Sequence, residues 1–250
     1  MSLRLRAQAP LALVAAAFFV SGAAGLVYQV AWQRILALHS GVGIYSIAMI
    51  VAAFMAGLGI GSHLGGRLSA PTTPGRALAL FGALEAAIAA FGALSAWIYY
   101  DLLYLRAGWL YAPAWRAGVL HFLGLLLPTT LMGMTLPFLV RAMVRDVGTA
   151  GRTIGSLYGV NLAGAAAGAL AAPWVLIPSG GIRGAVLAAA LGNAAAAVSA
   201  LALARWTVGA SADSSPSTPS PDPGPEPRRH PVGLWVLLYA ASGFVALSLE

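Results

Sequence analysis

The sequence contains no cysteine and few charged residues. The absence of cysteine excludes disulfide bonds and thiolate metal sites. Charged residues make up 8% of the chain and hydrophobic residues 60%, whereas soluble domains carry about 25% charged residues. Together with a mean hydropathy of +0.83, this composition indicates that lipid, rather than water, surrounds most of the polypeptide.

Long apolar runs separate the few charges that are present. A helix needs about 20 apolar residues to cross a bilayer, and six runs reach that length, although one of them, 77–100, is interrupted by Glu85. The other five contain no Asp, Glu, Arg or Lys and span 7–33, 35–66, 117–140, 153–182 and 184–204. Another apolar run begins after Pro231. We therefore predict an all-α, polytopic membrane protein with a six-helix transmembrane unit over 1–206 and the start of a seventh helix.

Arginine placement predicts the orientation of these helices. When the segments between the predicted helices are numbered alternately, ten arginines lie on the side of the N-terminus and four on the other side. Because cytoplasmic segments carry the excess of positive charge, we predict a multi-pass protein of the cell (inner) membrane with a cytoplasmic N-terminus. The net charge of +7 then reflects topology in the lipid bilayer, and no nucleic-acid partner is expected.

The segment 207–231 differs in composition from everything before it. Pro, Ser and Asp replace large apolar residues, and such a segment cannot bury enough surface to offset its chain entropy. We predict a disordered, Pro/Ser-rich cytoplasmic linker here. After it, Ser-Gly at 242–243 repeats Ser-Gly at 21–22, so we interpret 232–250 as the truncated start of a second, repeated transmembrane unit. Parallel repeats of this kind occur in major facilitator superfamily (MFS) transporters. The first unit would then be MFS-half-like, and the chain a fragment that lacks its C-terminal half.

Glycines recur at close to four-residue spacing in two of the predicted helices. Small residues at this spacing let helix backbones approach closely in lipid, so we expect them at helix–helix contacts. They are Gly57, Gly61 and Gly65 in the second helix, and Gly151, Gly155, Gly159, Gly164 and Gly168 in the fifth.

Two prolines lie within the fourth predicted helix. Pro128 and Pro137 each remove one backbone hydrogen bond. We expect the neighbouring Thr129, Thr130 and Thr135 to satisfy the carbonyl groups that are freed.

Glu85 is the most informative polar residue, because a carboxylate within the hydrocarbon costs several kcal/mol unless it is paired, protonated or facing a cavity. One hypothesis is that it binds a cationic substrate or a proton. The alternative is structural: a neighbouring helix caps the carboxylate, or it pairs with Arg67 or Arg76 near the cytoplasmic interface.

Four other polar residues are candidates for a central cavity. Each could instead join helices by hydrogen bonds, which are worth about 0.6 kcal/mol on average in membranes. They are Tyr28, Gln29, Asn161 and Asn193. The histidines are scattered without a metal-binding spacing, and no nucleophile or paired carboxylates form a catalytic pattern. We therefore expect no metal site, cofactor or catalytic residue in this chain.

Four motifs in order resemble the membrane region of fused MFS/spermidine synthase-type proteins. They are FFVSGAAGLVYQVAWQRIL, YSIAMIVAAFMAGLGIGSHLGGRL, LPTTLMGMTLPFLVR and GSLYGVNLAGAAAGAL, and the resemblance covers most of 15–195. In that family a soluble, Rossmann-like domain follows and would transfer an aminopropyl group from decarboxylated S-adenosylmethionine to putrescine. The resemblance therefore implies a missing catalytic domain and a polyamine ligand, and it identifies no catalytic residue in this chain.

Three functions follow from these observations. The first is a membrane region that anchors a spermidine synthase-like enzyme and handles polyamines, with Glu85 attracting the cationic amine. The alternative is a stand-alone MFS-type secondary transporter of a small, cationic solute. The third is a purely structural anchor, in which Glu85, Gln29 and Asn161 serve only folding.

Overall fold

The computed structural model describes residues 2–40, 44–111, 114–144 and 146–211, together with 237 and 241. Within these ranges the regular structure is entirely helical, which confirms the predicted all-α class there. The α-helices are α1 (Ser2–Ser40), α2 (Ile44–Ser69), α3 (Pro74–Ala96), α4 (Ala114–Met143), α5 (Val147–Ala171) and α6 (Ile177–Ser211). A π-helical segment, η1 (Trp97–Arg106), extends α3, a 3₁₀ turn, η2 (Gly108–Tyr111), follows it, and a π-helical turn, η3 (Ala172–Leu176), joins α5 to α6.

The chain divides into two compact units, Met1–Asp213 and Ser214–Glu250. Helix α6 ends at Ser211, inside the range 207–231 that was predicted as a linker. The rest of that range and most of the predicted second transmembrane unit, 232–250, lie outside the described residues.

In the part of the chain that the structure describes, five helical segments are long and apolar enough to cross a membrane. They are Leu11–Leu38, Ile47–Ser69, Pro74–Arg106, Trp115–Met143 and Gly148–Trp206. The first four overlap the first four predicted spans, although the second begins 12 residues later than predicted. The predicted fifth and sixth spans instead form one continuous segment of 59 residues, so the predicted count of six is not supported by this criterion. The reason is that helical turns continue through η3, and the backbone breaks only at Gly181 (φ 67°, ψ −177°).

Residue pairs between helices give the direction of each helix. Ser21 of α1 bonds to Glu85 of α3, and Trp32 of α1 bonds to Ser95 of α3, so these two helices run in the same direction. Helix α6 runs opposite to α3, because Glu85 meets Asn193 whereas the earlier Gly82 lies against the later Ala197.

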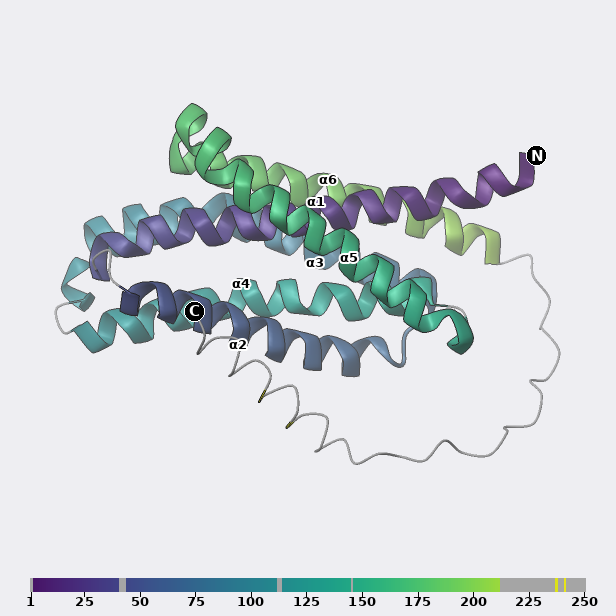
Figure 1. The fold of residues 1–250 in the computed structure, drawn as a ribbon, viewed down its shortest axis with the longest axis horizontal. Helices are drawn as coiled ribbons and strands as arrows, with labels where there is room; N and C mark the ends of the chain where they lie inside the picture. Colours follow the sequence, from purple (N-terminus) through teal and green to yellow (C-terminus); the bar gives the residue numbers. More distant parts are fainter. Residues whose placement is uncertain are drawn as a thin grey trace. The chain divides into compact units, whose positions relative to one another are not determined.

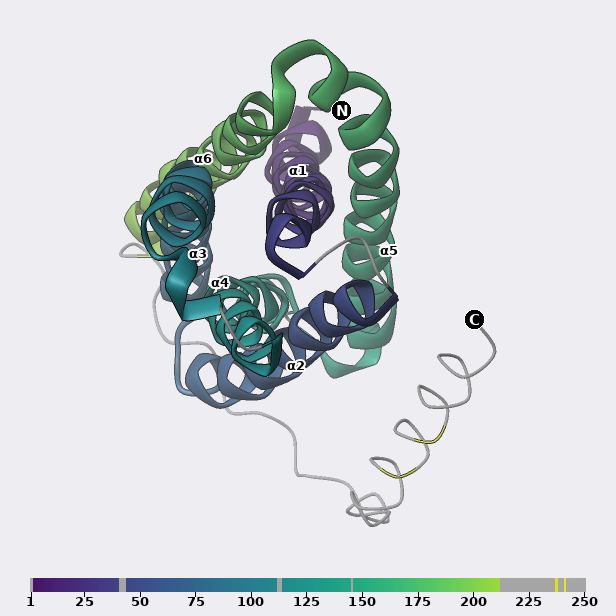
Figure 2. The ribbon, with the colours of Figure 1, turned by 90° about the vertical axis from the view of Figure 1, so that its left-hand side faces the viewer.

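Helix α5 runs parallel to α1 and is followed by a reversal. Gly164 lies against the backbone of Phe19, and Gly168 lies against that of Ala23. The chain then turns back into α6, as Figures 1 and 2 show at the upper edge of each view. The long fifth segment therefore consists of two limbs of opposite direction. In the end-on view, α1 lies between α5 and the pair formed by α3 and α6, with α2 and α4 below (Figure 2).

Helices α2 and α4 pack closely through glycine. A side chain on Gly57 would clash with Thr129, one on Gly61 with the carbonyl of Thr130, and one on Gly65 would lie 2.9 Å from Met134 Cα. These three glycines therefore occupy the kind of helix contact that their spacing predicted.

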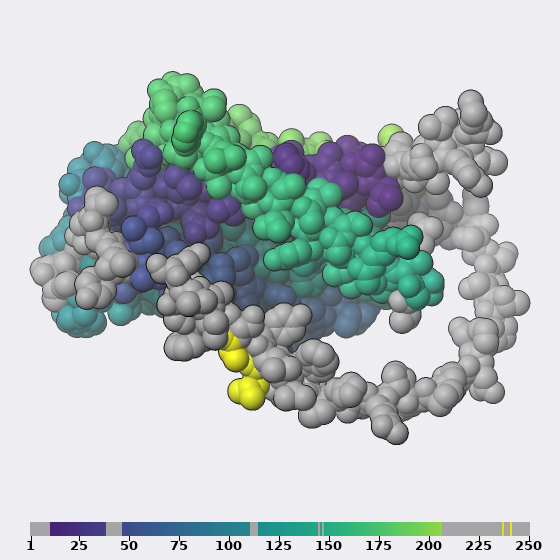
Figure 3. Space-filling model, viewed as in Figure 1, coloured from purple at the N-terminus to yellow at the C-terminus, as the bar shows by residue number. Residues whose placement is uncertain are grey.

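The glycines of α5 differ from one another. Gly164 and Gly168 lie against α1, but the positions where Gly151, Gly155 and Gly159 would carry a side chain meet no neighbouring atom within 4 Å among the described residues. The helix contact expected at Gly155 and Gly159 is therefore not present in this part of the structure. All three glycines are exposed, and Figure 3 shows α5 on the outer surface, where it crosses obliquely over α1.

The carbonyl freed by Pro128 finds a partner that the sequence did not suggest. Proline at 128 cannot donate to Gly124 O, four residues earlier. The hydroxyl of Tyr99, in η1, donates to Gly124 O at 2.8 Å. Thr129 and Thr135 bond instead to the carbonyls of Leu125 and Met132, so they do not serve the carbonyl that Pro128 leaves free.

Candidate functional site

The side chain of Glu85 lies at a junction of three helices. It projects from α3, is fully buried, and accepts one hydrogen bond at each carboxyl oxygen. The Ser21 hydroxyl of α1 donates to Oε1 at 2.6 Å, and Asn193 Nδ2 of α6 donates to Oε2 at 2.6 Å. We call Ser21, Glu85 and Asn193 the carboxyl cluster.

Apolar residues hold this carboxyl group between two cores. Phe81, one turn earlier on α3, belongs to a cluster with Phe18 and Phe138, and Ile88, one turn later, belongs to a cluster with Trp32. Phe18 meets Phe81 edge to face at a centroid distance of 6.1 Å. Because hydrocarbon lies on both sides of Glu85 along α3, only the polar atoms of α1 and α6 can satisfy it.

Among the described residues, Glu85 has no positively charged partner. Its hydrogen bonds come from two neutral side chains, rather than from Arg67 or Arg76, which were the alternative cationic partners. A hydrogen bond to a charged group stabilises a fold by about 1.5–3 kcal/mol, whereas an isolated carboxylate in hydrocarbon costs several kcal/mol. Two such bonds offset part of this cost, and a proton or an ammonium group would remove the rest.

The carboxyl cluster has a hydrogen-bonding pattern for each protonation state of Glu85. As placed, the Asn193 amide donates to a charged carboxylate, and Asn193 Oδ1 is buried without a partner among the described residues. The oxygen and nitrogen of an amide can exchange places by rotation about the last bond. In the exchanged orientation Oδ1 would accept a hydrogen bond from a neutral carboxyl group. The cluster can therefore hold a proton without rearranging any helix.

Tyr28 lies two turns beyond Ser21 on α1 and is also fully buried. Its ring stacks on Trp32 at 4.9 Å, and its hydroxyl lies against Gly92, where no side chain would fit. The hydroxyl has no hydrogen-bond partner among the described residues. Trp32 in turn donates from Nε1 to Ser95 Oγ at 2.8 Å. Tyr28 is thus part of an aromatic core beside the carboxyl cluster.

Gln29 and Asn161 lie apart from the carboxyl cluster. Gln29 is half-buried on α1 and makes no hydrogen bond to any of its three members among the described contacts. Asn161 of α5 donates from Nδ2 to Phe18 O at 3.0 Å and packs on Gly22, so it joins α5 to α1. Of the five predicted cavity residues, the structure therefore brings only Glu85 and Asn193 into direct hydrogen-bonded contact.

Ser21 was not predicted as a site residue. Its signal in the sequence is weak, because a serine in an apolar helix usually bonds to its own backbone. The stronger clue is its place in a glycine-containing stretch of α1 that packs closely against neighbouring helices. Only the fold shows that it faces Glu85.

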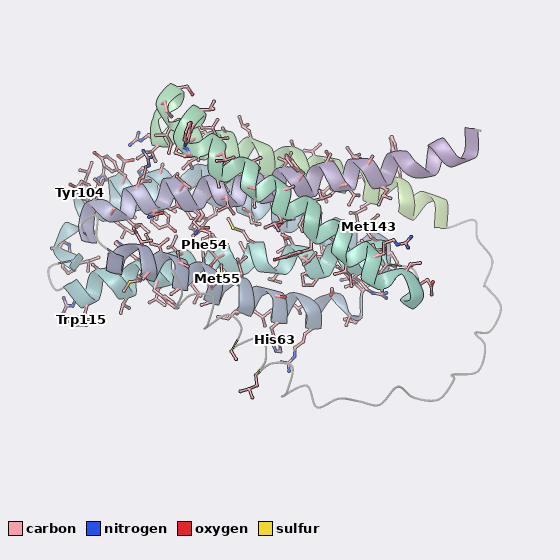
Figure 4. The ribbon with its side chains drawn as sticks, viewed as in Figure 1. Phe54, Met55, His63, Tyr104, Trp115 and Met143 are labelled. Atoms are coloured by element: carbon pink, nitrogen blue, oxygen red, sulfur yellow. The ribbon has the colours of Figure 1, made fainter. Side chains whose placement is uncertain are left out.

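A different polar pair lies at the end of the unit that carries Tyr104 and Trp115, opposite the end that carries Met143 (Figure 4). Arg183 forms a salt bridge with Asp101 at 2.8 Å and lies 5.9 Å from the ring of Tyr100. Arg183 is largely exposed, so this pair fixes the start of α6 against η1 and does not form an enclosed site. Among the described residues no cluster of His, Asp and Glu could hold a metal ion.

Comparisons with known proteins identify relatives. No family model matches the chain, and no solved structure matches it. The chain is 35% identical over 202 residues to a polyamine aminopropyltransferase of Mycobacterium tuberculosis, which is 79% of this chain and 37% of that protein. It is 32% identical over 200 residues to polyamine aminopropyltransferase 2 of Streptomyces coelicolor, which is 77% of this chain and 34% of that protein.

The chain therefore spans little more than a third of the length of the curated relatives that it matches. Their names support the predicted relation to spermidine synthase-like proteins, and they do not bear on the MFS fusion or on transport, which stay predictions. Over most of its length, the chain is related to one part of the polyamine aminopropyltransferases.

Proposed function

We propose that this chain is the membrane region of a longer polyamine aminopropyltransferase-like protein, which anchors a catalytic part outside the described helices. The observation that carries the proposal is the similarity of 79% of this chain to 37% of a polyamine aminopropyltransferase. That matched part is rich in helices long and apolar enough to cross a membrane. Such helices are suited to anchoring, and aminopropyl transfer would belong to the remaining length of the protein.

In this proposal the chain crosses the inner membrane six times. The 59-residue segment Gly148–Trp206 would measure about 90 Å as one straight helix at 1.5 Å per residue, whereas the hydrocarbon core is about 30 Å thick. The opposite directions of its two limbs support two crossings. The excess of arginine on one side supports a cytoplasmic N-terminus.

The proposal also gives the carboxyl cluster a role with polyamines. Glu85 is a buried carboxylate with neutral hydrogen-bond donors and without a cationic partner among the described residues. A proton or the ammonium group of a polyamine would neutralise it. The same geometry serves the alternative of a stand-alone transporter, so the two functions are separated by experiment.

The anchoring role is tested by fractionating cells that produce the native gene product, with and without its whole membrane part, which comprises residues 1–206 and the second transmembrane unit predicted to begin at 232. We expect aminopropyltransferase activity in carbonate-washed membranes of the intact protein and in the supernatant after the deletion. Activity that stays in the washed membranes after the deletion would overturn the anchoring role.

The role of Glu85 is tested by measuring how much radiolabelled putrescine is bound or taken up by vesicles that contain the protein. Glu85→Gln preserves the size of the side chain and removes its charge, and Gln29→Ala serves as a control outside the carboxyl cluster. We expect the Glu85→Gln vesicles to bind or take up less putrescine than wild type. Equal values in both would remove Glu85 from polyamine handling and leave anchoring unaffected.

A further inference from the structure

We propose that a cavity between α2, α3 and α4 binds an anionic phospholipid. The cavity has a volume of about 490 Å³ and is lined by the last residues of α2, the turn that follows, the first half of α3 and part of α4. This volume falls within the range of about 300–1,000 Å³ that is typical of ligand sites. None of the residues that line the cavity belongs to the carboxyl cluster, and the assignment of the cavity rests on the proposed membrane location.

The lining of the cavity changes from polar to apolar along α3. Arg76 and Thr72 supply its polar part, whereas Leu80, Leu84 and Phe138 belong to its apolar part. From Arg76 to Leu84 the helix rises by eight residues, or about 12 Å at 1.5 Å per residue. A ligand that fills the cavity therefore needs a charged end and an apolar end roughly that far apart.

The polar end of the cavity is positively charged. Arg76 is exposed and forms no ion pair among the described residues. Arg141 of α4 lies next to the cavity wall, because its Nε donates to the carbonyl oxygen of the lining residue Thr72 at 2.8 Å. The positive charges of Arg76 and Arg141 favour a phosphate group.

The apolar end indicates a lipid instead of a soluble anion. Leu84 and Met134 both line the cavity and both lie within segments that are apolar enough to cross a membrane. A free phosphate would contact only the arginines and leave the apolar walls unfilled, whereas an acyl chain would cover them. Basic pockets between helices at the cytoplasmic side are a known form of lipid headgroup recognition, and the arginine-rich end of this unit is the proposed cytoplasmic end.

The test compares the thermal unfolding midpoint of the full chain in phosphatidylcholine nanodiscs with and without phosphatidylglycerol. We expect phosphatidylglycerol to raise the midpoint by several degrees. Arg76→Gln should abolish this shift, and Ala83→Phe should do the same by filling the cavity from an exposed position of α3. Two matched controls should keep it: Arg152→Gln, an exposed arginine of α5, and Ala90→Phe, an exposed position of α3 that does not line the cavity.

Three results would overturn the inference. They are equal midpoints in the two kinds of nanodisc, a shift that survives both Arg76→Gln and Ala83→Phe, and a shift of the same size produced by inorganic phosphate in phosphatidylcholine. A failure of the proposed membrane location is seen separately, because the chain would then be extracted from membranes by carbonate.

Discussion

Helices α2 and α5 carry glycine series of the same four-residue spacing, but the structure uses them differently. Gly57 lies against the side chain of Thr129, and Gly61 and Gly65 lie against the backbone of α4, whereas a side chain added at Gly155 or Gly159 would meet no neighbour within 4 Å among the described residues. The spacing places the glycines on one face of a helix in both cases. Whether that face meets another helix depends on the path of the helix across the unit, which the local sequence does not encode.

The prediction with the largest expected effect on stability concerns a leucine placed at matched positions of the two glycine series. Gly61→Leu would drive its side chain into the carbonyl of Thr130 and the Cα of Gly133, which lies 2.9 Å from the first added carbon. Because backbone cannot move aside as a side chain can, we expect a loss of about 3 kcal/mol or more in the free energy of unfolding. Equilibrium unfolding in mixed micelles would measure it.

The control for that test is Gly159→Leu. Its side chain would enter open space, and substitutions of this kind usually change stability by no more than about 0.5 kcal/mol. Equal losses in Gly61→Leu and Gly159→Leu would contradict the difference between the two glycine series.

Variants of the carboxyl cluster compare the stability that hydrogen bonds between helices provide with the stability that close backbone packing provides. Glu85→Ala removes both hydrogen bonds and leaves a void between α1, α3 and α6. We expect a loss of roughly 2 kcal/mol, smaller than that of Gly61→Leu, because the substitution also removes a costly buried carboxylate. Unfolding in the same micelles gives the comparison.

Glu85→Gln is the matched variant for that prediction. Glutamine keeps the shape of the side chain and can still accept a bond from Ser21 or Asn193, so we expect a loss of less than about 1 kcal/mol. A loss in Glu85→Gln as large as that in Glu85→Ala would show that the negative charge itself stabilises the fold.

Alanine in the exposed part of the α5 series should stabilise the protein. The methyl group that Gly159→Ala adds would meet no atom within 4 Å among the described residues. Alanine also favours a helix over glycine by up to about 1 kcal/mol. The same change at Gly168, which lies against the backbone of Ala23, should instead destabilise it. Thermal unfolding midpoints that move in the same direction for both variants would contradict this assignment of the two positions.

The smallest expected effect lies near the start of α6. Asp101→Asn removes the salt bridge with Arg183, whose side chain is 63% exposed. Exposed ion pairs stabilise proteins by about 0–1 kcal/mol, so we expect a change of at most about 0.5 kcal/mol that shrinks further in high salt. A salt-independent loss above 1 kcal/mol would mean that Asp101 has another role in holding η1 against α6.

The sequence located the first four helices because each contains a charge-free or nearly charge-free run. It did not give all their ends, since α1 continues past Arg34 to Ser40 and α2 begins only at Ile44. It was less successful between α5 and α6. Arg183 interrupts the hydropathy there, but the backbone breaks at Gly181, and helical turns continue through η3 up to that point. Hydropathy reports which residues avoid water and does not report where a helix turns back.

The candidate site was predicted in part. Glu85 stands out in any apolar run because of the cost of burying its charge, and Asn193 was identified as a buried polar residue. Their contact, and the contribution of Ser21, depend on α1, α3 and α6 meeting at one level. The bond from Tyr99 to Gly124 was missed for the same reason, because it joins a π-helical segment to the turn before Pro128.

The amino-acid sequence alone predicted helices, in the part of the chain that the structure describes, that are apolar enough to cross a membrane and include one conspicuous carboxyl group, because the free energy of transfer from water to hydrocarbon is a property of each residue. Tertiary structure decided which glycines pack, which neutral groups satisfy Glu85, and which arginines lie at a cavity. Those outcomes depend on how helices cross one another, and crossing is set jointly by side chains that are far apart in the chain.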